Sequence, residues 1–376
     1  MKKALLIALC LLLAFSLIGC AQQANEPAVA PATQDPAPEQ PTSEQPSPEQ
    51  PAPEQPTPEQ PTSQENEAFN PDIETDTIPF DQLEARFGPV PEFDDVTIGV
   101  ILKNNANEFW LQLAEGMERG GAELGAVRVD VQATRTETDT AGQLAIAETM
   151  LENDYTVLLL SPLDNTNLDP AVSRAISDGV PIVNVNCEYI FNANSFVGPM
   201  QIEIGRMAAD YIADKLGGEG TVAILEGVPG TFTNTQRIAG FMENIVNYPG
   251  IEIVAQQTAN YELEQGLDVA TNILTLHPDV DAFYCANDNM ALGVVEALRG
   301  TGRLGEVIIV GVDGTGGAFD SIRAGEMTAT VDQFPELNGF AGVEVAFRLL
   351  GGQAIPRVVS TPVAVIDANN MAQYGK

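Results

Sequence analysis

The stretch AFYCANDNMALGVVEALRGTGRLGEVIIVGVD, residues 282–313, decides the fold because it contains a complete strand–helix–strand unit. Residues 282–285 and 307–312 are short apolar runs, which predict two buried strands. Between them, residues 289–299 carry apolar side chains at the spacing of one helix face. A helix that connects two strands in this way makes them parallel, with a right-handed crossover. The stretch therefore predicts an α/β fold.

The same alternation of strand and helix extends through most of the chain. We expect strands at residues 96–102, 127–131, 156–160, 182–185, 221–225, 251–255, 282–285, 307–312 and 328–331. We expect helices at residues 107–124, 138–153, 169–178, 201–216, 233–248, 264–276, 289–299, 317–324 and 337–350. So many strands exceed what one such sheet usually carries. The sequence therefore predicts two doubly wound parallel-sheet lobes, whose ligands bind at the carboxyl ends of the strands.

The N-terminus has the pattern of a secretory leader. Lys2 and Lys3 precede an apolar run over residues 4–17, and small residues lead to Cys20. The alternative is a membrane-spanning helix, but the run is shorter than the roughly 20 residues that a bilayer requires. The segment Leu-Ile-Gly-Cys resembles the lipobox of bacterial lipoproteins. That resemblance implies a signal peptide at residues 1–19 and a lipid on Cys20.

Residues 20–90 have the composition of a linker. The five-residue units PAPEQ, PTSEQ, PSPEQ, PAPEQ and PTPEQ follow one another over residues 36–60. Proline at this density favours extended polyproline II geometry, which buries no core. No basic residue lies between Lys3 and Arg86, so the acidic side chains repel one another. We interpret the segment as a disordered spacer between membrane and globular part; a proline-rich ligand for a recognition domain is the alternative.

The charge of the chain excludes one class of partner. The protein has 53 acidic and 17 basic residues, for a formal net charge of −36. A surface of this sign repels phosphate backbones, so we expect no nucleic-acid binding. The simplest explanation of the charge is solubility outside the cell.

Histidine and cysteine are too few for several kinds of site. The only histidine, His277, precedes a proline at an expected helix end, which argues against a Ser-His-Asp triad or a multi-histidine zinc site. We expect neither a metal nor a cofactor. Cys187 and Cys285 are the only cysteines beyond Cys20 and lie in different halves of the globular part. A disulfide between them is possible in an exported protein, but we favour two separate buried thiols.

Aromatic and polar residues follow the expected strands. Phe109 and Trp110, the only tryptophan, come shortly after the first strand. Flat side chains stack on the C–H faces of sugar rings, so this position is suited to a carbohydrate; packing at the start of the helix is the alternative. Other strand ends lead into polar residues, which serve as a candidate site or as helix caps: Asn186 with Cys187, Asn287 with Asp288, Asp313, and Asp332 with Gln333. Arg237 begins a helix, which opposes the helix dipole and suggests another partner, either a ligand or a salt bridge.

From residue 94 to about residue 367 the chain resembles the sugar-binding proteins of ABC importers, the ribose- and galactose-binding type of the type I periplasmic binding proteins. The stretches that carry the resemblance are NEFW (107–110), residues 227–241 with Arg237, ANDNMALG (286–293), VGVDG (310–314) and DQFP (332–335). It implies an N-terminal lobe at residues 93–198 plus 334–361 and a C-terminal lobe at residues 199–333 plus 362–376. A three-crossover hinge near residues 198, 333 and 361 would join them.

The resemblance also implies roles for individual residues. The ring would be sandwiched by Phe109, Trp110 and Tyr261, although hinge-side packing is an alternative for Tyr261. The hydroxyls would be hydrogen-bonded by Asn107, Arg237, Asn287, Asp313 and Gln333.

One departure from the family pattern concerns the sugar. Ribose-type proteins carry an Asp-Arg pair where this chain has Asn186 and Cys187. Cysteine lacks the planar five-donor fork of arginine, which puts ribose itself in doubt. Another monosaccharide, a polyol such as an inositol, or a furanose-like signal becomes credible. Lys103, Asn105 and Glu108 are candidates for the missing polar group.

These features together predict an extracytoplasmic, monomeric solute-binding lipoprotein that closes on a sugar or polyol and delivers it to an ABC permease. A receptor that presents the ligand to a membrane sensor is the alternative. A DNA-binding regulator of the same core fold is contradicted by the leader and linker. A glycosidase would need two carboxylates facing one bond. Only Asp313 is a strong cleft acid, so we expect no enzyme.

Overall fold

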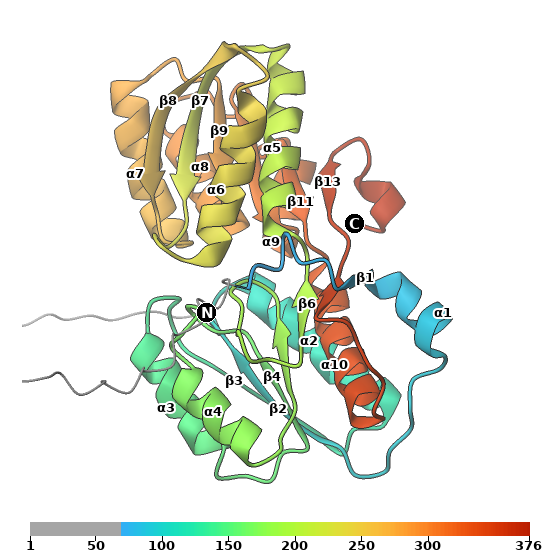
Figure 1. The fold of residues 1–376 in the computed structure, drawn as a ribbon. Coiled ribbons are helices and arrows are strands. Elements are labelled where there is room, and N and C mark those ends of the chain that lie inside the picture. Colours follow the sequence, from blue (N-terminus) through green and yellow to red (C-terminus); the bar gives the residue numbers. More distant parts are fainter. Residues whose placement is uncertain (1–68) are drawn as a thin grey trace, which may run out of the picture. The chain divides into compact units, whose positions relative to one another are not determined.

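Two sheets form the core of the computed structural model, which describes residues 69–376 (Figure 1). The first sheet has the order β1 (Thr77–Pro79), β12 (Val358–Ser360), β6 (Ser195–Gly198), β5 (Ile182–Val185), β4 (Val157–Leu160), β2 (Thr97–Leu102) and β3 (Arg128–Ala133). The second has the order β13 (Ala364–Asp367), β11 (Ala329–Asp332), β10 (Ile308–Asp313), β9 (Ala282–Cys285), β7 (Glu219–Glu226) and β8 (Gly250–Thr258). All neighbours are parallel except β13, which pairs antiparallel with β11. The predicted pair of parallel-sheet lobes is confirmed.

Helices cover both sheets. Their bounds are α1 (Leu83–Phe87), α2 (Glu108–Leu124), α3 (Thr140–Met150), α4 (Asp169–Ser177), α5 (Gln201–Leu216), α6 (Phe232–Ile245), α7 (Leu263–Leu276), α8 (Asp288–Arg299), α9 (Gly316–Arg323) and α10 (Pro335–Leu350), with short 3₁₀ turns at Phe80–Gln82 and Met371–Tyr374. Every strand and helix expected from the sequence is present, with small shifts at the ends. The elements β1, β6, β12, β13 and α1 were not expected; each is only three to five residues long.

The chain passes between the two sheets at three places. It leaves the first sheet after β6 to form α5, returns after β11 to form α10, and leaves again between β12 and β13. This is the expected three-crossover connection. We use first lobe and second lobe for the first and second sheets with the helices that pack on them.

Close packing of α5 on α6 fixes the position of the helix that carries Arg237. A Cβ atom on Gly205 would lie 2.0 Å from the carbonyl oxygen of Arg237, and one on Gly240 would lie 2.0 Å from that of Ile202. Only glycine permits this approach, because real Cβ contacts are never so short. The two helices therefore hold Arg237 at a fixed depth in the second lobe.

The expectation that the spacer extends to residue 90 is wrong. Residues 69–90 belong to the fold: β1 pairs with β12, and Leu83 is fully buried. The Asp72 carboxylate accepts hydrogen bonds of 2.8 and 2.9 Å from the amides of Gln201 and Ile202 at the start of α5. The composition of this segment resembles that of the linker, but its contacts are with distant parts of the chain. The expected signal peptide and Cys20 lie outside the described residues, among which no helix has the length and apolar character needed to span a membrane.

Candidate functional site

The residues at the carboxyl ends of the strands of both sheets converge on one cavity. It is lined by Lys103, Asn107, Phe109, Trp110, Glu137, Cys187, Thr233, Arg237, Tyr261, Asn287 and Asp313. Its volume is about 20 Å³. Ligand pockets usually measure roughly 300–1,000 Å³, so a ligand requires the lobes or their side chains to move apart. Eight of the ten residues expected from the sequence line this cavity; Asn186 and Gln333 lie behind it.

The aromatic side of the cavity comes from the first turn of α2. The rings of Phe109 and Trp110 lie edge to face with centroids 4.9 Å apart, and each side chain is 2 % exposed. Asn107 caps the helix by accepting a hydrogen bond of 3.1 Å from the Phe109 amide. Its amide nitrogen lies 3.4 Å from Oε1 of Glu137. Asn107 therefore has the capping role as well as a place at the cavity.

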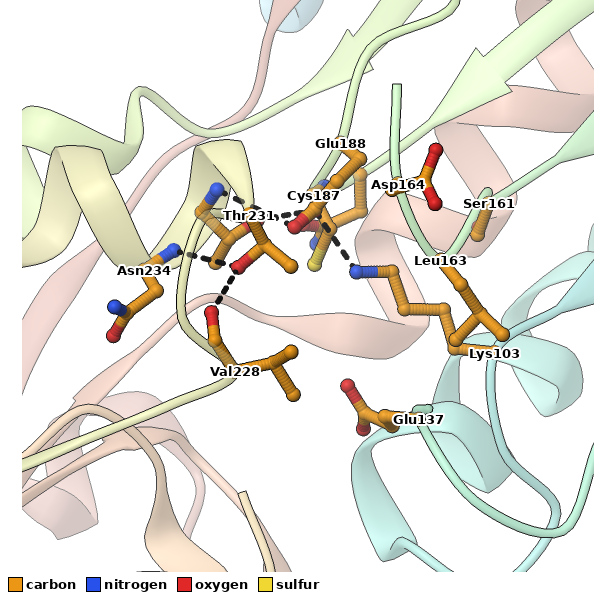
Figure 2. A network of polar contacts seen from close by, with 12 residues as sticks. Lys103, Glu137, Ser161, Leu163, Asp164, Cys187, Glu188, Val228, Thr231 and Asn234 are labelled. Carbon is orange, nitrogen blue, oxygen red and sulfur yellow. Dashed lines mark hydrogen bonds and ion pairs between the residues drawn. The ribbon is translucent and has the colours of Figure 1, made fainter. Parts of the chain in front are cut away.

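Two charged residues supply the polar side of the first lobe. Glu137 accepts a hydrogen bond of 2.8 Å from Nε1 of Trp110. Nζ of Lys103 lies 2.9 Å from Oε2 of Glu188 (Figure 2). It also lies 5.8 Å from the centre of the Trp110 ring. Burial lowers the pKa of Lys103, but Glu188, Cys187 and Glu137 together raise the pKa above its ordinary value, which keeps the ammonium charged. Burial raises the pKa of Glu137.

Sequence reasoning did not name Glu137 or Glu188. Glu137 follows the end of β3, so the rule that selects residues after strands could have found it. Glu188 follows Cys187 directly, one residue beyond the pair that the sequence singled out.

Arg237 and Asp313 form the charged centre of the second lobe. Nη1 of Arg237 lies 3.8 Å from Oδ1 of Asp313 and donates a hydrogen bond to the carbonyl oxygen of Ala286. Its Nε donates a bond of 2.9 Å to Oε1 of Gln201. Burial raises the pKa of Asp313 well above its usual range, and the Arg237 guanidinium opposes that shift. Both residues are less than 5 % exposed, so any hydroxyl that reaches them is in a dry environment.

Tyr261 and Asn287 complete this wall. Asn287 caps α8 by accepting a bond of 2.9 Å from the Met290 amide, and its Nδ2 donates to the carbonyl oxygen of Tyr261. The Tyr261 ring lies against the backbone of Gly227, where an added Cβ would come within 1.9 Å of the ring. Its buried hydroxyl has no hydrogen-bond partner among the described residues. A buried donor without a partner is costly, so the hydroxyl is well suited to a ligand oxygen.

Asn186 and Gln333 stand behind the cavity wall. Gln333 donates a bond of 2.8 Å to Oδ1 of Asp313, and its own Oε1 has no partner among the described residues. Asn186 has φ 57° and accepts a bond from the amide of Cys187. Its Nδ2 is also without a partner in the described part of the chain. Gln333 thus holds the carboxylate of Asp313 in place, and Asn186 shapes the turn after β5.

The two thiols are buried, and Asp288 and Asp332 are bonded to neighbouring groups. Cys187 and Cys285 are both free and buried, as expected, and burial raises the pKa of Cys187 to about 12. The Asp288 carboxylate accepts bonds of 2.9 Å from the amides of Gly314 and Thr315, and Asp332 lies 3.2 Å from Nζ of Lys376. Within residues 69–376 no cluster of histidine, cysteine and acidic side chains is placed to hold a metal ion.

Comparisons with known proteins agree with the two-lobed fold. Residues 98–354 match the model of the periplasmic binding protein domain. The chain is 37 % identical over 279 residues to the D-allose-binding periplasmic protein of Escherichia coli, covering 72 % of this chain and 89 % of that protein. It is 33 % identical over 270 residues to the ribose import binding protein of Bacillus subtilis, covering 72 % and 86 %.

Solved structures give the same result. A solute-binding protein of Actinobacillus succinogenes with bound D-allose superposes with a TM-score of 0.70 at 31 % identity, covering 74 % of this chain and 100 % of that one. One from Bacillus halodurans with bound myo-inositol has a TM-score of 0.67 at 27 % identity, covering 74 % and 96 %.

Proposed function

The chain belongs to the periplasmic binding protein family, and we propose that it captures a monosaccharide or polyol between its lobes for delivery to the permease of an ABC transporter. The observation that carries the proposal is the cavity at the carboxyl ends of both sheets, which combines aromatic rings with buried charged groups. Rings stack on the apolar faces of a sugar, and ionised donors and acceptors form the stronger hydrogen bonds to its hydroxyls.

We propose the eight predicted cavity residues as ligand contacts, together with Lys103 and Glu137. Lys103 offers a cation where the Asp-Arg pair of ribose-type proteins is replaced by Asn186 and Cys187. The small thiol leaves more room than a guanidinium, which favours a sugar larger than ribose. D-Allose is therefore the first candidate, followed by D-ribose and myo-inositol. Each of these ligands appears in the name of a relative or is bound in a similar solved structure.

Binding would close the lobes around the ligand. The cavity is too small to admit a sugar from solvent without an opening of the cleft. We place the moving boundaries at residues 198, 333 and 361, where the chain passes between the sheets. Closure on a ligand is a hinge motion in which a few residues absorb the change of backbone angles.

We also propose that the protein is a lipoprotein anchored through Cys20, with the acidic, proline-rich residues 20–68 as spacer. A tethered receptor stays near the permease while it samples solute. Labelling of cells with radioactive palmitate tests this: the native chain should take up the label and the Cys20→Ser variant should not. Equal labelling of both would contradict the anchor.

Calorimetry with D-allose, D-ribose and myo-inositol tests the ligand. We expect saturable binding of at least one of them to the full-length chain, and recovery of the sugar chemically unchanged, as a non-enzyme requires. Asp313→Ala should abolish that binding, whereas Asp320→Ala, an exposed acid on α9, should leave it unchanged. Absence of saturable binding across the three ligands and further pentoses and hexoses would contradict the proposal. Uptake of the labelled ligand by cells that lack the protein should fall, a result that separates transport from sensing.

A further inference from the structure

We propose that Glu108 and Glu188 of the first lobe form a latch that holds the lobes closed by bonding the N-termini of two second-lobe helices. The inference rests on the proposed function for its ligand but not for its geometry. Both residues act as positioning residues: neither lines the cavity, and each bonds a group on the opposite lobe.

Glu108 makes a two-pronged contact with α9. Its Oε1 accepts a hydrogen bond of 3.0 Å from the amide of Gly316, and its Oε2 accepts one of 3.0 Å from the amide of Gly317. These are the first two residues of α9, so their N–H groups have no acceptor within the helix. Negative charge at a helix N-terminus is also favoured by the helix dipole. The carboxylate thus satisfies donors that otherwise need water.

The sequence of α9 is adapted to this contact. A Cβ atom on Gly316 would come within 2.5 Å of Oε1 of Glu108. Neither Gly316 nor Gly317 has a positive φ that would itself require glycine. Glycine weakens a helix relative to alanine, so its presence at both positions requires another reason. The space for the carboxylate supplies that reason at Gly316.

Glu188 makes the second contact, with α6. Its Oε2 accepts a bond of 2.7 Å from the hydroxyl of Thr233, and Oε1 lies 3.4 Å from the Thr233 amide. Thr231 already caps α6, which leaves the Thr233 amide for a partner outside the helix (Figure 2). Glu188 is fully buried and also pairs with Lys103, a cavity residue. Opening of the lobes would therefore break a bond to the same carboxylate that holds Lys103 in place.

A latch of this kind raises affinity without touching the ligand. The apparent Kd of a protein that binds only in its closed form rises as the closed fraction falls. Loss of the latch should therefore weaken binding and act mainly through faster dissociation.

Amide hydrogen exchange tests the latch directly, because Glu108 is the only acceptor among residues 69–376 for the Gly316 and Gly317 amides in the closed arrangement. We would label glycine selectively with ¹⁵N in the full-length chain and compare Glu108→Gln with the native sequence. We expect exchange at Gly316 and Gly317 to accelerate about tenfold, with other glycines of the second lobe unchanged. Glu123→Gln, an exposed change on the same helix α2, is the matched control and should have no effect.

Sugar binding provides the second readout. Glu108→Gln, Gly316→Ala and Thr233→Val should each raise the Kd for D-allose about three- to tenfold, and the first two combined should be no worse than either alone because they break one contact. Glu188→Gln is avoided because it leaves Lys103 buried without its partner. Native exchange rates in Glu108→Gln, or additive losses in the double variant, would overturn the latch. If the native protein binds no sugar, the proposed function fails, while the exchange rates still decide the latch.

Discussion

The indole Nε1 of Trp110 donates a hydrogen bond of 2.8 Å to the carboxylate of Glu137, which joins the only tryptophan of the chain to a buried acid. This bond fixes the ring at the wall of the cavity. The negative charge of Glu137 also acts on Lys103 and is one source of the raised pKa of that lysine. The aromatic and charged halves of the first-lobe wall are therefore one unit.

Replacing Glu137 should weaken sugar binding more than it weakens the fold. In Glu137→Gln the amide oxygen can still accept from Trp110, but the charge beside Lys103 is lost. Hydrogen bonds to a charged group contribute about 1.5–3 kcal/mol, so we expect the Kd for D-allose to rise roughly tenfold. Calorimetry measures this, with the exposed Glu118→Gln on α2 as control. An unchanged Kd would show that Glu137 serves only to hold the indole.

Arginine at position 237 should not be replaceable by lysine. The guanidinium bonds Gln201 and Ala286 with two different nitrogens while it faces Asp313. A lysine ammonium is a point charge on a flexible stem and cannot reproduce this planar fork. We expect Arg237→Lys to raise the Kd for D-allose by roughly 100-fold, whereas Arg206→Lys on the exposed face of α5 should leave it unchanged. Binding within a factor of three of the native value would remove Arg237 from the site.

The architecture could be predicted because each longer strand or helix has a recognisable pattern in its own sequence. Buried parallel strands are continuous apolar runs, and the helices between them show a helical period. The elements β6, β12 and β13 were missed because they are short and, unlike the equally short β4 and β9, do not lie between two helices. Residues 69–90 were assigned to the spacer because composition is all that their sequence offers. These residues are held in the fold by the pairing of β1 with β12 and by the hydrogen bonds of Asp72 to α5. No local sequence pattern encodes either contact.

Part of the candidate site could also be predicted from the strands. Residues after the inner strands were found because parallel strands bring their carboxyl ends together. Glu137 follows β3, which lies at the edge of the first sheet and has a partly exposed, less apolar sequence. The residues after this strand were therefore not predicted to belong to the site. Glu108 was named only as a substitute sugar contact. Its bonds to α9 depend on the distance between two lobes, which a single sequence does not contain.

Cys187 should react with thiol reagents only when the cleft opens. Burial raises the pKa of its thiol to about 12, so the reactive thiolate is scarce at neutral pH. The residue lines the cavity, whereas Cys285 is buried in the core of the second lobe. We expect slow labelling of Cys187 by iodoacetamide at pH 8, further slowed at least fivefold by saturating D-allose, as measured by mass spectrometry of peptides. Labelling of Cys187 at the same rate with and without sugar would place it outside the ligand's reach.

Asp332 should make the stability of the protein depend on pH, whereas the Asp332→Asn variant should lack this dependence. Burial raises its pKa to about 6, although Lys376 opposes the shift, and its Oδ1 accepts a bond of 2.7 Å from the Phe334 amide. In the unfolded chain the pKa of an aspartate is about 3.9. Between about pH 3.9 and pH 6 the folded protein therefore binds more protons than the unfolded chain. The free energy of unfolding that this group contributes therefore rises as the pH falls through 6 and is lost as the pH rises. Asp332→Asn keeps an acceptor for Phe334 but does not titrate.

Urea unfolding of both proteins at pH 7.5 and pH 5.0 measures the effect. We expect the native protein to gain about 1.4 kcal/mol relative to Asp332→Asn over this interval, as a shift of roughly two pKa units implies. Asp320→Asn, an exposed acid on α9, should follow the native protein at both pH values. The gain arises on the acidic side because burial disfavours the charged carboxylate more than Lys376 stabilises it. A gain on the alkaline side would mean that the ion pair with Lys376 dominates and that Asp332 is stabilised in its charged form.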